Sequence, residues 1–222
     1  MNNQKINKLQ DNQAYKLLEK YKIPVAKHIF IKNSKTFRKD IESAIMTDSK
    51  KNQLFAMEFP IVLKIDGDVI HKKQAGCVEI IYNNSELKPK LDNILKNSKK
   101  FKTHGMIIQE FIQGKEVMLG AKRDPQFGTI IMFGAGGVLA NMLKDVSFRV
   151  LPAEHQELEI MVKETKAYQV FIEHDEQLLQ EIIELIQKLI RLVEADPKIK
   201  ELDINPLFLS DEPIAGDVRI IY

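Results

Sequence analysis

The chain has 222 residues, of which 44% are hydrophobic and 29% charged, a composition typical of a globular protein that is large enough for two small lobes. Its 33 Lys and Arg residues against 31 Asp and Glu leave a net charge of +2, so neither a nucleic-acid-binding protein nor an acidic disordered chain is indicated. The single cysteine, Cys77, excludes an intramolecular disulfide, and no secretory signal or bilayer-length apolar run of roughly 20 residues is present. We therefore expect a cytoplasmic protein that neither enters a membrane nor binds nucleic acid.

The first half of the chain alternates helical and extended patterns. Helices are predicted where apolar residues recur every three or four positions, and strands where short runs are apolar and β-branched. These patterns predict a helix at 12–21, a strand at 25–31, a helix at 34–45, strands at 61–65 and 78–82, a helix at 85–97 and a strand at 106–109. Residues 66–76 have no periodicity and are predicted to form a loop, and a hinge is expected near 109–112.

The second half begins with a predicted hairpin, strands 116–123 and 129–133 joined by a loop that contains Pro125 and Gly128. A glycine-rich turn follows at 134–137. Helices are then predicted at 154–167 and 176–194, and strands at 199–209 and 214–220. Strands and helices that are mixed in this way predict the α/β (α+β) class.

One strand pattern places three oxygen-bearing side chains on a single face. In the predicted strand 199–209, alternation puts Glu201, Asp203 and Asn205 on one side and apolar residues on the other. Mg²⁺ takes hard oxygen ligands, often one or two from the protein, and Asp217 on the next strand is a further candidate. The alternative is a solvated polar face on an edge strand.

The turn between these two strands decides which side Asp217 occupies. A three-residue turn that closes Leu209 on Pro213 places Asp217 opposite Asn205. A four-residue turn sends Asp217 to the other face of the sheet. The sequence leaves both registers open.

Two side chains in the first half are candidates for phosphate chemistry. Lys64 interrupts an apolar strand, where a buried ammonium needs an anion such as phosphate, unless the side chain snorkels from an edge strand. His71 lies in the aperiodic loop beside Lys72 and Lys73 and before Gly76, so it could act as a nucleophile toward phosphorus while cations and backbone N–H groups hold the oxygens. An ordinary surface histidine is the alternative.

Two further features are compatible with a nucleotide. The glycine turn 134–137 does not complete a dinucleotide fingerprint, because the third glycine would fall at Leu139, so it is either a phosphate-approaching turn or a tight structural one. Glu110 and Glu116 bracket a short segment between strands, where main-chain groups could meet an adenine and a carboxylate could meet ribose hydroxyls. Surface carboxylates are the alternative.

Several longer motifs resemble those of a known family. They are AYKLL (14–18), YKIPV (21–25), FPIVLKI (59–65), VIHK (69–72) leading to Gly76, KRDPQFG (122–128), MFGAGG (132–137), LKDVSFR (143–149) and ELDINPL (201–207). From about residue 15 to its end, the chain resembles the nucleotide-binding β subunit of ADP-forming acyl-CoA synthetases. Within these it is most similar to ADP-forming acetate–CoA ligase, a relative of succinyl-CoA synthetase.

The resemblance implies an ATP-grasp fold with two α/β lobes and the nucleotide between them. The smaller lobe would comprise residues 23–109 and the larger one residues 1–22 and 110–222. It implies that acyl-CoA, phosphate and ADP are interconverted with acid, CoA and ATP through a phosphohistidine on a companion subunit. It also implies ATP or ADP and Mg²⁺ as cofactors, and a CoA-binding α subunit as partner in an α2β2 hetero-oligomer.

The same resemblance assigns roles residue by residue. The residues that it implies for nucleotide binding are Lys64 at the phosphates, Gly76 in the loop, Glu110 and Ile112 at the adenine hinge, and Glu116 at the ribose. Asn205 and Asp217 would bind Mg²⁺. His71 would belong to the phosphate relay, and Asp203 would orient the incoming phosphohistidine.

The chain departs from the family pattern at four places. Cys77 replaces a second glycine, Lys73 replaces Ser or Thr, Asn141 replaces Glu, and residues 171–175 replace a Gly-x-Arg-Gly loop. Cys77, Asn141 and the missing loop motivate one alternative, a catalytically impaired ATP-grasp subunit that binds or regulates a catalytic partner. An ATP-grasp carboxylate–amine or carboxylate–thiol ligase with other substrates is the remaining alternative.

Overall fold

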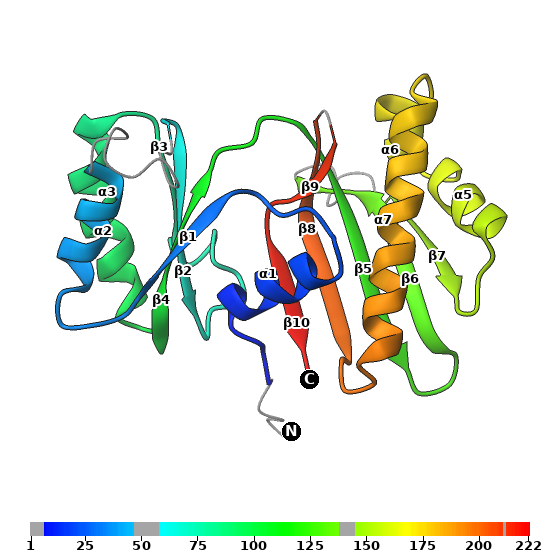
Figure 1. The fold of residues 1–222 in the computed structure, drawn as a ribbon, viewed down its shortest axis with the longest axis horizontal. Helices are drawn as coiled ribbons and strands as arrows, with labels where there is room; N and C mark the ends of the chain where they lie inside the picture. The colour runs from blue at the N-terminus through cyan, green and yellow to red at the C-terminus, as the bar shows by residue number, and fades with distance from the viewer. Residues whose placement is uncertain (1–6, 47–57, 138–144, 211) are drawn as a thin grey trace. The chain divides into compact units, whose positions relative to one another are not determined.

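The computed structural model describes residues 7–46, 58–137, 145–210 and 212–222 (Figure 1). The chain divides into two compact units. Unit 1 comprises Met1–Leu9, Gln13–Val25 and Ile112–Tyr222, and unit 2 comprises Gln10–Asn12 and Ala26–Phe111. Each unit has its own antiparallel sheet with helices packed on it, which confirms the predicted mixture of helices and strands.

Unit 2 is built on a four-stranded sheet in the order β1-β4-β2-β3. Its elements are β1 (His28–Lys32), α2 (Phe37–Met46), β2 (Ile61–Gly67), β3 (Val78–Ile81), α3 (Asn84–Ser98) and β4 (Thr103–Glu110). Every residue of β2 is buried because β4 and β3 flank it on both sides. Apolar residues of β2, such as Leu63 and Ile65, form one core with Leu91 and Ile94 of α3. Burial of this apolar surface holds the helices on the sheet.

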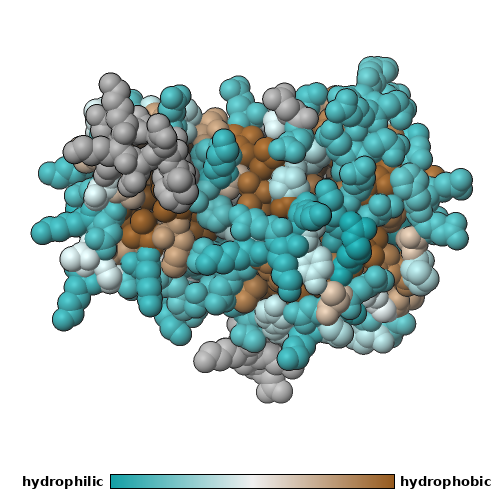
Figure 2. All heavy atoms as spheres, viewed as in Figure 1, coloured by the Kyte–Doolittle hydropathy of each residue, from teal (hydrophilic) through white to brown (hydrophobic). Residues whose placement is uncertain are grey.

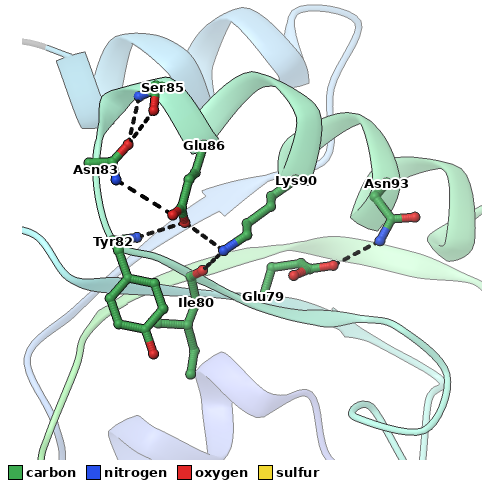
Figure 3. A network of polar contacts seen from close by, with 8 residues as sticks. All are labelled: Glu79, Ile80, Tyr82, Asn83, Ser85, Glu86, Lys90 and Asn93. Atoms are coloured by element: carbon green, nitrogen blue, oxygen red, sulfur yellow. Dashed lines mark hydrogen bonds and ion pairs between the residues drawn. The ribbon is translucent and has the colours of Figure 1, made fainter.

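A polar network fastens the start of α3 to the end of β3 (Figure 3). Asn83 caps the helix through its side chain. The Glu86 carboxylate accepts a hydrogen bond from the backbone N–H of Tyr82 at 3.2 Å and pairs with Lys90 Nζ at 2.6 Å. Lys90 also donates to the Ile80 carbonyl at 2.7 Å, so one side chain joins the helix to the strand.

Unit 1 is built on a six-stranded sheet in the order β10-β8-β5-β6-β7, with β9 also paired to β8. Its elements are most of α1 (Asp11–Lys20), β5 (Lys115–Asp124), β6 (Gly128–Ala135), β7 (Val146–Val150), α5 (His155–Lys163), α6 (Lys166–Phe171), α7 (Glu176–Ala195), β8 (Glu201–Leu209), β9 (Pro213–Ala215) and β10 (Val218–Ile221). The long hairpin predicted for the start of this half corresponds to β5 and β6.

One face of the unit 1 sheet is covered by α7, which lies in front of β5 and β6 in Figure 1. Nine side chains of this helix are buried, and the polar residues on its opposite side contribute to the hydrophilic surface in Figure 2. Strand residues that face α7, including Leu119, Phe133 and Ile204, are fully buried. Alternation then directs their neighbours to the other face of the sheet. In the part of the chain that the structure describes, no helix is long and apolar enough to cross a membrane.

Three elements differ from the sequence predictions. Strand β7 was not predicted, although it pairs with β6 along its whole length. The helix predicted at 154–167 is two helices, because the Thr165 side chain accepts a hydrogen bond from Tyr168 N and caps a new one. The strand predicted at 214–220 is β9 and β10, separated at Gly216, whose N–H donates to the Pro206 carbonyl at 2.9 Å.

The Asp145 carboxylate holds the first turn of α6 and lies 8% exposed. It accepts hydrogen bonds from the backbone N–H groups of Lys166 and Ala167, each at 2.8 Å. We expect Asp145→Ala to lower the free energy of unfolding by about 1–2 kcal/mol, because two helix N–H groups lose their acceptor. Urea denaturation measures this loss. Asp92→Ala, which removes an exposed carboxylate paired with Arg38, is the control and should have the smaller effect.

Candidate functional site

The predicted site residues are distributed over both units, and each unit is described by itself. Unit 2 carries Lys64, His71, Gly76 and Glu110. Unit 1 carries Ile112, Glu116, Asp203, Asn205 and Asp217.

Lys64 is a buried lysine in the middle of the unit 2 sheet. It pairs with Val78 on β3 and with Ile107 on β4, and its side chain is 7% exposed. Its Nζ donates a hydrogen bond to Gln109 Oε1 at 2.8 Å. Because β2 is an inner strand, the alternative of a lysine that snorkels from a sheet edge is wrong. A desolvated ammonium at this place is suited to an anion.

His71 lies in the turn between β2 and β3, in the aperiodic segment. Its imidazole is exposed, whereas Val69 and Lys72 on either side are buried. The turn is closed by hydrogen bonds from Ala75 N to the His71 carbonyl at 3.0 Å and from Cys77 N to the Lys72 carbonyl at 2.8 Å. The histidine is therefore presented to solvent by a turn with a defined backbone.

Gly76 and Cys77 end this turn. Gly76 has φ +63°, and a Cβ there would overlap the Asn97 side chain, which donates to the Gly76 carbonyl at 3.1 Å. Glycine is thus required by both conformation and space. The Cys77 side chain lies in the apolar core of unit 2, where burial raises the pKa of its thiol. The cysteine that replaces the family glycine consequently directs its side chain into the core.

Glu110 and Ile112 lie at the end of unit 2 and the start of unit 1, respectively. The Glu110 carboxylate accepts a hydrogen bond from Lys27 N at 2.7 Å, and Glu110 N donates to the Lys27 carbonyl at 3.0 Å. Its carboxylate is therefore engaged with the backbone that precedes β1. Ile112 is half-buried.

Glu116 lies beneath the glycine turn of unit 1. Its carbonyl accepts a hydrogen bond from Gly136 N at 2.9 Å. Gly137 has φ +58°, and a Cβ at that position would overlap Glu116 Oε2. The glycines of this turn are therefore explained by its tight backbone alone, because they let the chain close over the Glu116 carboxylate.

Of the two turns that the sequence left open, the three-residue turn is the one that joins β8 and β9. Leu209 pairs with Pro213, and the same register continues to the pair of Ile204 with Val218. Asn205 N donates to the Asp217 carbonyl at 3.1 Å, so these two residues are cross-strand neighbours. The exposed Asn205 and the half-buried Asp217 therefore lie opposite each other, as the three-residue turn predicts.

A β-bulge lies at Asn205. On the β5 side, Val117 pairs with Leu207 and Leu119 pairs with Ile204, so two residues of β8 stand against one of β5. The two residues are Asn205 and the following proline. Bulges re-aim side chains and are common next to functional sites.

Asp203 belongs to a charged cluster on the face of the sheet opposite α7. It lies across from Arg219 on β10 and Gly120 on β5. Arg219 bonds to Glu201 and lies 3.8 Å from Asp203 Oδ2. Burial raises the pKa of Asp203, the Arg219 guanidinium opposes this rise, and Glu201 and Asp217 add to it.

Arg219 was missed by the sequence predictions. Its spacing of two residues from Asp217 in a strand was a usable signal, because alternate residues share a face.

The charged cluster forms one end of a hollow of about 350 Å³. The hollow is also lined by apolar side chains of β5, β6 and β7, namely Met118, Ile130, Met132 and Phe148. Gly120 leaves room between the two parts, since a Cβ there would lie 3.0 Å from Met132 Cε. An apolar wall beside charged groups suits a ligand that has a flat apolar part and a polar part.

The comparisons with known proteins agree on one family. A family model described as "ATP-grasp domain" matches residues 1–221. The β subunit of acetate–CoA ligase (ADP-forming) I from Pyrococcus furiosus is 34% identical over 224 residues, which cover 96% of this chain and 91% of that protein.

Two solved structures of one enzyme, the dinucleotide-forming acetyl-coenzyme A synthetase 1 of Ca. Korarchaeum cryptofilum, are similar to this chain. The first, in complex with coenzyme A, Ca-AMPCP and HgCl+, has a TM-score of 0.80 at 30% identity and covers 97% of this chain and 93% of that one. The second is in complex with coenzyme A and Mg-AMPPCP, with its phosphohistidine segment pointing towards the nucleotide binding site. Its TM-score is 0.73 at 28% identity, with 97% and 92% covered.

The family model spans nearly the whole chain, and the relative from P. furiosus exceeds 30% identity over nearly its whole length. These matches confirm the resemblance inferred from the motifs, including the ATP-grasp fold and the class of ligase. The chain therefore belongs to the ATP-grasp family, among the β subunits of ADP-forming acetate–CoA ligases.

Proposed function

We propose that this chain binds ATP or ADP with Mg²⁺ and passes a phosphoryl group between the nucleotide and a phosphohistidine on a partner subunit. In this function, acyl-CoA, phosphate and ADP are interconverted with acid, CoA and ATP. His71 takes part in the relay, and Asp203 orients the incoming phosphohistidine. Catalysis of this kind needs positioning and cationic screening more than covalent help from the protein.

The observation that carries the proposal is the placement of Asn205 and Asp217 as cross-strand neighbours, two strand positions from the Asp203–Arg219 pair. Mg²⁺ often takes only one or two ligands from the protein when phosphates and water supply the others. One amide and one carboxylate match that number. Within the described ranges, no group of three or more His, Cys, Asp or Glu side chains could hold a metal by itself. The residues present therefore fit Mg²⁺ that arrives with a nucleotide, and the ion would neutralise phosphate charge there.

In unit 2, Lys64 and His71 support the same function. The buried ammonium of Lys64 is proposed to contact the nucleotide phosphates, and the turn that contains Gly76 is proposed to approach them through its backbone. Glu110 and Ile112 are proposed to meet the adenine, and Glu116 the ribose. The Glu110 carboxylate also accepts a hydrogen bond from Lys27 N, and the Glu116 carboxylate lies close to Gly137. Each carboxylate would therefore bind the nucleotide with the acceptor positions that these contacts leave.

We propose as partner a CoA-binding α subunit in an α2β2 assembly. The relative from P. furiosus is named a β subunit, and the K. cryptofilum structures contain coenzyme A. Size-exclusion chromatography of the chain alone and mixed with its partner tests this association.

Calorimetric titration with ATP and ADP, each with and without Mg²⁺, tests the nucleotide site. In Asn205→Ala we expect the affinity with Mg²⁺ to fall at least about tenfold, or ~1.4 kcal/mol, because the ion loses a ligand. Affinity without Mg²⁺ should be unchanged. Asn93→Ala, which removes an exposed amide from α3, is the control and should bind as the wild type does. Equal binding by Asn205→Ala and wild type with Mg²⁺ contradicts the metal assignment.

The alternative of an impaired subunit loses one of its reasons. Cys77 was a reason because a side chain there could block the approach of a phosphate, yet this side chain is fully buried in the core. Asn141, a second reason, lies outside the described residues. The third reason, the loop that residues 171–175 replace, still stands. We propose the catalytically active subunit because none of the departures falls on Lys64, His71, Asn205 or Asp217.

A further inference from the structure

A buried ion pair lies next to the exposed His71. Lys72 Nζ is 3.0 Å from Asp11 Oδ2, and the two side chains are 6% and 1% exposed. These residues are 61 positions apart in the chain, and both belong to unit 2. The residue that follows the relay histidine is therefore held by the first residue of α1.

A second carboxylate holds Asp11 in turn. The backbone N–H of Asp11 donates to Asp66 Oδ1 at 3.1 Å, and that of Asn12 donates to Asp66 Oδ2 at 3.2 Å. Asp66 is fully buried near the end of β2, two residues beyond Lys64. Its carboxylate satisfies N–H groups at the start of α1, which would otherwise lack acceptors inside the helix. The sheet thus fixes Asp11, and Asp11 contacts Lys72.

In this turn, two exposed side chains lie between two buried ones. Val69 and Lys72 point inward, whereas Ile70 and His71 point outward. Val69 is anchored in the apolar core, but Lys72 can be buried only because a carboxylate meets its charge. The ion pair is therefore the anchor on the C-terminal side of His71.

A buried ion pair is a poor means of increasing the free energy of unfolding if stability is its only role. Taking two charges out of water costs several kcal/mol per ion, and apolar side chains of similar volume are often as stable or more stable. A charged pair does, however, specify one geometry for the backbone that carries it. Reacting groups need positions accurate to about 0.5 Å, and a misplacement of about 1 Å can cost roughly 100-fold in rate.

We propose that Asp11 is a positioning residue for His71, which it holds in place through Lys72. This inference rests on the proposed relay function of His71. Loss of the Asp11 charge should leave nucleotide affinity intact while lowering the rate of phosphoryl transfer through His71 by about 10- to 100-fold.

The test uses the complex of this chain with its partner subunit and three variants. Asp11→Asn keeps the shape of the side chain and removes its charge. Asp11→Leu/Lys72→Met removes both charges, so that no uncompensated ion stays buried. Asp92→Asn makes the same chemical change at an exposed ion pair of unit 2 and is the control.

Four measurements are made on each complex. Acid-labile ³²P on this chain, transferred from labelled ATP, reports the rate through His71. Hydrogen exchange of the backbone amides of residues 75–77 reports how well the turn is fixed. Thermal unfolding reports stability, and titration with ADP reports nucleotide affinity.

We expect both Asp11 variants to exchange faster in the turn and to transfer phosphate slowly at wild-type ADP affinity, while Asp92→Asn matches the wild type. The double variant distinguishes positioning from stability, since it should regain thermal stability without regaining transfer. If it regains both, or if Asp11→Asn transfers at the wild-type rate, Asp11 has no positioning role and the relay itself stands. If the wild-type chain acquires no label that His71→Ala removes, the relay is wrong, and the positioning role is wrong with it.

Discussion

Replacing His71 by alanine is expected to reduce ATP synthesis from acetyl-CoA, phosphate and ADP by about 10³-fold or more in the assembled complex, because the phosphoryl group loses its acceptor nitrogen. The side chain is exposed on a turn whose backbone is held by other residues, so the fold should not change. Coupled assay of ATP formation measures the rate, and calorimetry with ADP should give the wild-type affinity.

His155→Ala is the matched control for this loss. His155 is also an exposed histidine, at the start of α5, and its ring contacts Gln187. We expect this variant to retain full activity. Full activity of His71→Ala would exclude His71 from the relay, whereas loss of ADP binding together with activity would show that the histidine acts at the nucleotide instead.

The second large effect is expected for Lys64→Met, which keeps an unbranched buried side chain and removes its charge. A charged contact to a phosphate contributes about 1.5–3 kcal/mol, so the affinity for ATP and ADP should fall roughly 10- to 150-fold. Calorimetric titration measures this change. The fold should survive because an apolar side chain is compatible with a strand that is buried along its whole length.

Lys90→Met is the matched control for Lys64→Met. Lys90 also belongs to unit 2 but lies at the surface of α3, where it pairs with Glu86. Its replacement should leave nucleotide affinity unchanged. Wild-type affinity in a well-folded Lys64→Met variant would overturn the assignment of Lys64 to the phosphates, and Gln109 would then be its structural partner alone.

Most of the secondary structure was predictable from local pattern. The periodicity of the segment 176–194 determines α7 almost to the residue, because nine apolar side chains at helical spacing can be buried on one side only. Strand β7 was not predicted although Val146, Phe148 and Val150 alternate with polar residues, because a pattern of only five residues is too short to be distinctive. The division of one predicted helix into α5 and α6 depends on a cap at Thr165, which hydropathy does not reveal.

The sequence could name candidate residues but could not give their contacts. The sequence alone left Lys64 on an edge strand or an inner one, and left two registers for Asp217. In the structure, β2 pairs with a strand on each side, and Leu209 pairs with Pro213. These pairings decide between the alternatives. The roles of the candidates in nucleotide and metal binding stay predictions that the variants above test.

The sequence by itself determined the fold class, most of the elements and the family, because these depend on local periodicity and on motifs of adjacent residues. Only the tertiary structure placed Arg219 beside Asp203 and Asp11 beside Lys72. The latter pair is separated by 61 residues, and no local pattern specifies which charge will be buried against which. Such contacts are decided by strand register and by the need of each buried charge for a partner, and both are properties of the folded chain.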